Sequence, residues 1–155
     1  MKRLFVLLAL AVGVLAMSSC DEYDDGVRPS KSIRNQFESM YPNAKDVEWD
    51  REGYYWKVSF ETGSLMSRTD HEAWYDNNGT WLRTETDMYL SAVPQDILDY
   101  LKASEYASAI IEDNDVDYVE TPQGNYYKFD VIFGGIELSI KVDEDGNVGI
   151  AGIER

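Results

Sequence analysis

The stretch that decides the fold runs from Tyr54 to Phe60 and has the sequence YYWKVSF. Large apolar side chains stand at every second position, beginning with Tyr54, and they alternate with Tyr55, Lys57 and Ser59. This period of two predicts a strand that has one face against a core. We therefore expect the first set to point toward the core and the second set to point away from it.

Three turns divide the surrounding sequence into hairpins. Residues 76–79 (DNNG) and 143–146 (DEDG) each separate two strand-like segments, and Gly134-Gly135 separates two more. The final glycine of the first two turns supplies the positive φ that tight turns require. The strands are expected at 72–75 and 80–86, at 136–142 and 147–153, and on both sides of 134–135.

Two short amphipathic helices are predicted. Ser32 is expected to cap the first helix and Pro42 to end it, and its apolar residues recur every three to four positions: Ile33, Phe37 and Met40. Pro94 suits the first turn of the second helix, which has one apolar side: Ile97, Leu98 and Leu101.

The two halves of the chain have the same order of elements, and matching segments can be aligned. Segments 41–44, 55–58 and 75–79 match 106–109, 126–129 and 142–146. The alignment requires a longer first strand region in the second copy and a longer loop at 63–70 in the first. We predict an α+β fold with two tandem helix-plus-four-strand repeats, at about 32–88 and 93–153. They are expected to form an antiparallel sheet of about eight strands with the helices on one face.

A family resemblance rests on these motifs: Tyr41-Pro42-Asn43-Ala44, Val47-Glu48-Trp49, Tyr55-Trp56-Lys57-Val58 and Tyr75-Asp76-Asn77-Asn78-Gly79-Thr80-Trp81, with Tyr126-Tyr127-Lys128-Phe129 and Val142-Asp143-Glu144-Asp145-Gly146 in the second copy. The pattern resembles the PepSY-like lipoproteins, whose fold is related to beta-lactamase-inhibitor protein. The resemblance spans 32–153 and implies a tandem repeat with a concave sheet. It also implies binding or inhibition of another protein, with a protease as one candidate, and it implies no catalytic residue. The second copy departs from the motif at Ala107, where the first copy has Pro42.

The first residues are typical of a bacterial lipoprotein signal. Residues 1–19 begin with two cations and continue with an apolar run too short for a permanent membrane helix. Cys20, the sole cysteine, follows small residues as in a lipobox, and we predict that it is lipidated after cleavage; an incidental cysteine is the alternative. Residues 20–31 are expected to form an acidic tether, followed by a PepSY-like domain at 32–155. The acidic stretch favours an outer-membrane or cell-surface location, with the periplasmic side of the envelope as the alternative.

Charge excludes several classes of partner. The formal net charge is −15, with 29 acidic and 14 basic residues. Binding to nucleic acid or to anionic headgroups depends on clusters of lysine and arginine, which this sequence lacks. We therefore expect no nucleic-acid partner, and membrane contact only through the lipid anchor.

No pattern in the sequence indicates an enzyme, a metal site or a cofactor. His71 is the only histidine, so a catalytic triad or a zinc site has too few ligands, and we expect a loop or strand-edge residue. Asp113, Asp115 and Asp117 have the spacing of a calcium loop, but Tyr118 and Gly124 stand where that loop needs Gly and Glu. A solvated acidic strand or loop is the simpler interpretation.

The candidate binding residues lie on the sheet face expected to be opposite the helices: Tyr55, Lys57, Trp74, Tyr126 and Lys128. Exposed aromatic residues bury a large area at modest entropic cost, so they suit a contact surface. Ordinary cross-strand pairing is the alternative interpretation. The leading functional hypothesis is a non-enzymatic, lipid-anchored binding protein that resembles a protease inhibitor. The alternative is a carbohydrate-binding or nutrient-uptake accessory lipoprotein at the cell surface.

Overall fold

The computed structural model describes residues 28–112 and 114–151. The predicted signal peptide at 1–19, the lipidation site Cys20 and most of the predicted tether lie outside the described residues. Within the described ranges, no helix has the length and apolar character needed to cross a bilayer.

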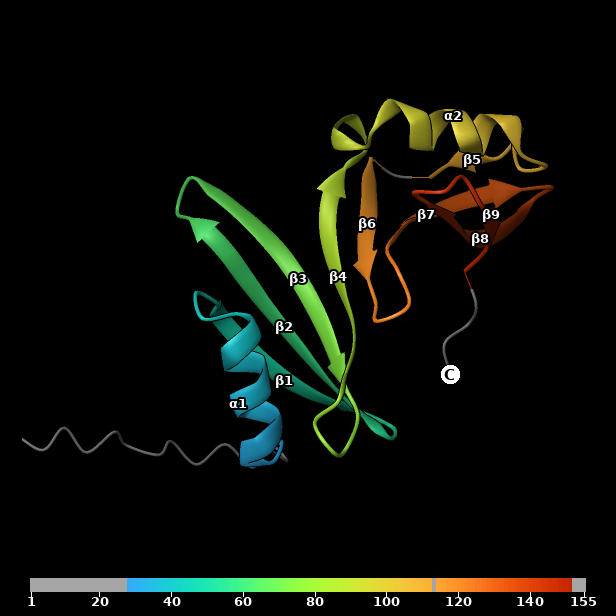
Figure 1. Cartoon of the computed structure of the whole chain (residues 1–155). Helices are drawn as coiled ribbons and strands as arrows, with labels where there is room; N and C mark the ends of the chain where they lie inside the picture. Colours follow the sequence, from blue (N-terminus) through green and yellow to red (C-terminus); the bar gives the residue numbers. More distant parts are fainter. Residues whose placement is uncertain (1–27, 113, 152–155) are drawn as a thin grey trace, which may run out of the picture.

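The described chain folds into two helices, a short 3₁₀ helix and one antiparallel sheet of nine strands (Figure 1). The first half contains α1 (Lys31–Met40), β1 (Lys45–Glu52), β2 (Tyr55–Ser64), β3 (Ser67–Tyr75) and β4 (Trp81–Tyr89). After η1 (Leu90–Ala92), the second half contains α2 (Gln95–Ala103), β5 (Ile110–Ile111), β6 (Asp115–Glu120), β7 (Tyr126–Phe133), β8 (Ile136–Asp143) and β9 (Val148–Ile150). The sheet order is β1-β2-β3-β4-β6-β7-β8-β9, and β5 also pairs with β7. The predicted α+β class is confirmed.

Both predicted helices are present, with small differences at their starts. Ser30, rather than the expected Ser32, caps α1, because the Ser30 hydroxyl accepts a hydrogen bond from the backbone amide of Ile33 at 3.4 Å. Pro94 is the N-cap of α2 and directly precedes its first turn. Each helix buries two apolar residues one turn apart: Ile33 and Phe37 in α1, and Ile97 and Leu101 in α2.

Two apolar clusters lie under the two helices, on the same side of the sheet. The first combines α1 with Trp56, Val58, Phe60, Ala73 and Tyr75, and the second combines α2 with Val116, Phe129, Val131, Ile140 and Val142. Strand β4 connects them, because Thr84 opposes Ala73 of the first cluster and Met88 opposes Val116 of the second. Thr84 and Met88 are four residues apart on one strand and therefore share a face.

The hairpins follow the predicted turns, with one correction. The turns at 76–79, 134–135 and 143–146 join β3 to β4, β7 to β8 and β8 to β9. The expected loop at 63–70 is wrong, because β2 and β3 continue through it until Ser64 opposes Ser67. The extra residues of the first copy therefore extend the β2–β3 hairpin and do not form a long loop. Gly63 has φ +93° at this tight end.

The second copy differs from the first beside its central hairpin. A single strand, β1, pairs with β2 and carries a bulge between Lys45 and Glu48. The equivalent position beside β7 is filled by two segments, with Ile111 opposite Val131 and Asp117 opposite Lys128. The predicted longer first strand region is therefore divided into β5 and β6, which explains nine strands where about eight were expected.

Candidate functional site

The sheet face opposite the helices carries most of the candidate residues. We call it the open face and define it by eight residues: Lys57, Glu72, Trp74, Arg83, Glu85, Asp117, Tyr126 and Lys128. Each lies next to a core residue along its strand or opposite another member across the sheet, so these side chains point away from the helices. In the part of the chain that the structure describes, neither helix covers this face (Figure 1).

Paired charges extend across the open face. The Lys57 ammonium lies 2.9 Å from Glu72 and 3.5 Å from Glu52, and the hydrogen bond to Glu72 raises the pKa of Lys57. Lys128 lies between Asp117, at 2.8 Å, and Glu85. Burial alone would lower the pKa of Lys128, but its hydrogen bonds to Asp117 and Glu85 outweigh that effect and raise it. Both lysines are therefore charged and held in place at neutral pH.

Trp74 points to the open face as predicted, but it is only 6% exposed. The Arg83 guanidinium lies 3.8 Å from the ring centroid, and the indole nitrogen donates a hydrogen bond to Glu52 at 3.1 Å. Arg83 also lies 2.9 Å from Glu85. The expectation of an exposed Trp74 is therefore wrong, because a cation–π contact covers the ring.

A β-bulge in β4 produces this arrangement. Trp74 opposes Arg83, whereas the next residue, Tyr75, opposes Trp81, so Leu82 is an extra residue in β4. Two residues of a bulged strand oppose one residue of the partner, and bulges re-aim side chains. Leu82 and Arg83 are both placed beside Trp74 in this way.

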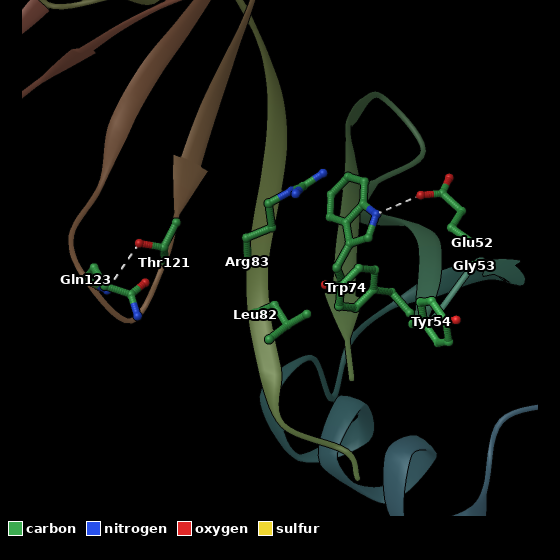
Figure 2. Close-up of a pocket in the computed structure, with 9 residues that line it drawn as sticks. Glu52, Gly53, Tyr54, Trp74, Leu82, Arg83, Thr121 and Gln123 are labelled. Atoms are coloured by element: carbon green, nitrogen blue, oxygen red, sulfur yellow. Dashed lines mark hydrogen bonds between the residues drawn. The ribbon is translucent and has the colours of Figure 1, made fainter. Parts of the chain in front are cut away.

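A pocket of about 620 Å³ opens at this end of the open face (Figure 2). Trp74, Arg83 and Leu82 come from the bulged β3–β4 pair, and Glu52 ends β1. Tyr54 and Tyr55 also line the pocket, with exposed fractions of 81% and 38%. Gly53, Thr121 and Gln123 complete the lining.

Tyr54 corrects the sequence prediction, which placed it in the core. It lies in the turn between β1 and β2, next to Gly53, and precedes the first residue of β2. The alternation begins only at Tyr55, so Trp56, Val58 and Phe60 are buried as expected while Tyr54 is not. The turn therefore places this aromatic ring at the mouth of the pocket.

The structure divides the five predicted site residues into three environments. Tyr55 and Trp74 line the pocket, and Lys57 and Lys128 belong to the charge network. Tyr126 lines a second hollow of about 450 Å³ at the β6–β7 and β8–β9 turns. The Lys141 ammonium lies 5.6 Å from the Tyr126 ring centroid, and burial raises the pKa of Tyr126.

The sequence interpretation predicted only Tyr55 and Trp74 among the residues that line the pocket. Of the residues that it missed, Glu52, Leu82 and Arg83 lie beside Trp74, and no local motif distinguishes them. Their role depends on the bulge and on the end of β1, which bring them to Trp74 from two sides (Figure 2). An arginine next to a strand that carries an outward tryptophan is the one signal that could have suggested the pair.

The sequence predicted that His71 lies in a loop or at a strand edge, and this prediction is wrong. His71 lies in β3, which pairs with β2 on one side and with β4 on the other. Its ring nitrogens are hydrogen-bonded to the hydroxyls of Thr62, at 2.7 Å, and Thr86, at 2.9 Å, and the ring stacks on Phe60. Burial lowers the pKa of His71, so the ring is neutral at pH 7. A histidine held in this way serves the structure of the sheet.

The acidic segment that resembled a calcium loop is largely a strand. Asp115 and Asp117 belong to β6, and Asp113 lies outside the described residues. Asp117 opposes Asp87 of β4; burial raises the pKa of Asp87 to about 6, and the charge of Asp117 adds to the effect. Among the described residues, no three His, Cys, Asp or Glu side chains are arranged to hold a metal ion.

Comparisons with known proteins agree with this architecture. The model of the family described as "Putative beta-lactamase-inhibitor-like, PepSY-like" matches residues 54–149, which is more than half of the chain. No curated protein is similar enough to count as a match.

Solved structures with the same fold come from Bacteroides. A BLIP-like protein from Bacteroides fragilis has 24% identity and a TM-score of 0.69, covering 85% of this chain and 94% of its own. A putative periplasmic protein from Bacteroides eggerthii has 21% identity and a TM-score of 0.64, covering 79% and 86%. A DUF2874 family protein from Bacteroides ovatus has 20% identity and a TM-score of 0.66, covering 81% and 89%.

Proposed function

Because the chain belongs to the beta-lactamase-inhibitor-like, PepSY-like family, we propose that it is a non-enzymatic protein of the cell envelope that binds another protein through its open face. The observation that carries this proposal is the pocket that Tyr54 and Tyr55 line together with the Trp74–Arg83 pair. Tyrosine, tryptophan and arginine are the residues that most often dominate the energy of protein interfaces. Here they lie together at one end of a sheet face.

The charge network supports the same proposal. Lys57, Lys128 and Arg83 are each held by carboxylates before any partner arrives. Side chains that are already ordered lose little entropy on binding, so the open face is prepared for a rigid partner. A protease is one candidate, in line with the inhibitor-like character of the family.

The alternative of a glycan ligand has weaker support. Sugars bind by stacking on an open aromatic face, but Trp74 is 6% exposed and Arg83 lies over its ring. The exposed rings of Tyr54 and Tyr55 lie at the mouth of the pocket and suit an apolar side chain of a protein equally well. The covered ring of Trp74 is therefore the observation that supports a protein partner over a glycan.

Capture of partners from a native envelope extract tests the proposal. We expect the double substitution Tyr54→Ala and Tyr55→Ala to weaken capture by about 30-fold, which corresponds to a loss of about 2 kcal/mol at the centre of an interface. Tyr89→Ala is the matched control, because Tyr89 is an exposed tyrosine at the far end of β4. Equal capture by the three proteins, with unchanged folding, would exclude the pocket as a binding site. Assays with purified proteases and a glycan array then identify the class of partner.

We also propose that Cys20 carries the lipid that holds the protein on the membrane, after removal of residues 1–19. The support is the sequence pattern before Cys20 and the relative that is described as a putative periplasmic protein. Mass spectrometry of the protein from a membrane fraction should find diacylglycerol on Cys20, and Cys20→Ala should release the protein. An unmodified Cys20 in membrane-bound protein would contradict the lipid anchor.

A further inference from the structure

Strand β1 forms one end of the sheet, and its outer edge has no partner strand in the described part of the chain (Figure 1). Seven of its eight residues are exposed. After the bulge, Glu48 to Glu52 pair regularly with Ser59 to Tyr55 of β2. Alternate residues of an antiparallel edge strand direct their N–H and C=O groups away from the sheet, so this segment can pair with an added strand.

Carboxylates mark one side of this edge. Glu48, Asp50 and Glu52 oppose Ser59, Lys57 and Tyr55, so they point to the open-face side of the sheet. Glu52 already contacts Lys57 and Trp74. Glu48 and Asp50 have no side-chain hydrogen bond or ion pair within the described residues. These two unpaired carboxylates can therefore receive cations from an added strand.

A largely apolar hollow lies on the other side of the same edge. It has a volume of about 450 Å³ and lies between α1 and β1. Phe37, Tyr41 and Pro42 line it from the helix end, and Val47 and Trp49 line it from β1. Arg34 and Glu38 of α1 also line it. Val47 is 40% exposed, so the hollow is open to solvent next to the strand edge.

From this juxtaposition we infer that β1 binds an extended segment of a basic partner by strand addition. The residue of the partner opposite Trp49 points toward α1 and places an apolar side chain in the hollow. Its two neighbours point to the opposite side, where Glu48 and Asp50 favour lysine or arginine. The recognised core is therefore a basic–apolar–basic tripeptide in extended conformation, as in other complexes formed by strand addition.

The charges of the chain support this occupant over a second copy of the same chain. An edge-to-edge dimer that continued the sheet with helices on one side would set Glu48, Asp50 and Glu52 against the same carboxylates of the second copy. Like charges opposite each other destabilise a strand pair. The net charge of −15 attracts a basic segment at longer range. Glu52 also lines the pocket on the open face, but Glu48 and Asp50, which carry the inference, do not, so the inference stands independently of the proposed function.

Binding of a blocked heptapeptide, Thr-Lys-Val-Lys-Val-Lys-Thr, to the full chain tests the inference by calorimetry. Two backbone-methylated versions separate strand addition from simple charge attraction. One carries N-methyl groups on the valines and the other on the lysines, and only one of these sets can face β1. We expect one version to bind as the parent does and the other to lose measurable affinity. Equal affinity of both versions with the parent would overturn the inference.

Reversing the charges of Glu48 and Asp50 on the protein is the second test of the inference. The double substitution Glu48→Lys and Asp50→Lys is expected to weaken binding of the heptapeptide by about tenfold or more, and to allow binding of a version with glutamate in place of lysine. The matched control is Glu137→Lys with Asp145→Lys, which changes the net charge equally at exposed positions of β8 and the β8–β9 turn. Equal weakening by both pairs would overturn the inference. A second result would also overturn it. If sedimentation detects a dimer of the wild-type chain and the Glu48→Lys, Asp50→Lys variant is a monomer, the edge of β1 binds a second copy of this chain and not a basic partner.

Discussion

Replacing Thr84 with valine tests how a buried hydroxyl of β4 holds the C-terminal end of α1 and the indole of Trp81. Thr84 is 1% exposed and belongs to β4, where it opposes Glu120 of β6. Its hydroxyl oxygen lies 2.5 Å from the Tyr41 hydroxyl and accepts a hydrogen bond from the indole nitrogen of Trp81 at 2.9 Å. Valine keeps the shape of threonine but removes the oxygen, so both partners lose a hydrogen bond at once.

The expected loss of unfolding free energy is about 2 kcal/mol. A donor left without a partner away from water costs about 1–3 kcal/mol. Trp81 and Tyr41 are each only partly buried, so each loss lies near the lower end of that range and the two together give about 2 kcal/mol. Thr84→Ser keeps the hydroxyl and is expected to cost less than Thr84→Val.

Urea unfolding measures the loss of unfolding free energy and the coupling energy between the two hydroxyls. It is applied to the wild type, to Thr84→Val, to Tyr41→Phe and to the double variant. If the hydroxyl pair contributes as described, the double variant loses less than the sum of the two single variants. A Thr84→Val protein within about 0.5 kcal/mol of wild type, or two strictly additive losses, would refute the reasoning.

Two further predictions concern a turn and a pair of carboxylates. Gly63→Ala should destabilise by about 3 kcal/mol in thermal unfolding, because its Cβ would lie 2.1 Å from the Ser67 carbonyl at φ +93°. Gly134→Ala should cost only about 1 kcal/mol, because its Cβ meets open space at φ +61°, and equal losses would contradict this explanation. Asp87→Asn should stabilise the protein by about 1 kcal/mol at pH 7.5, after allowance for its exposure, and hardly at all at pH 4. The sign follows because the folded-state pKa is raised from 3.8 to about 6, so ionisation of Asp87 increasingly opposes folding between these pH values and does so fully above about 6. Urea unfolding that shows the same gain at both pH values would contradict this explanation.

Local sequence patterns predicted the elements of this fold well. The alternation from Tyr55 onward, the DNNG and DEDG turns and the spacing of Ile33 and Phe37 depend only on neighbours along the chain. Such signals can be recognised without the tertiary structure. The prediction of Tyr54 in the core was wrong because alternation alone does not show where a strand begins.

The candidate site was only partly predictable, for a different physical reason. The side of the sheet on which Trp74 lies follows from the period of two, but its burial depends on Arg83 across a bulge. A bulge adds one residue to one strand, and nothing in residues 81–84 marks its position. The environment of His71 likewise depends on Thr62 and Thr86 from two other strands.

The pairing of β4 with β6 also bears on how far such a sheet can grow. The last strand of one repeat is joined to the first long strand of the next, and the same rule applied between molecules would pair β9 of one copy with β1 of another. A head-to-tail contact of this kind does not close on itself and produces a filament. In the described chain, β4 pairs six of its nine residues with β6, whereas β9 has only three residues, and β1 is bulged and charged. The short final strand and the acidic first strand therefore disfavour such a contact between copies.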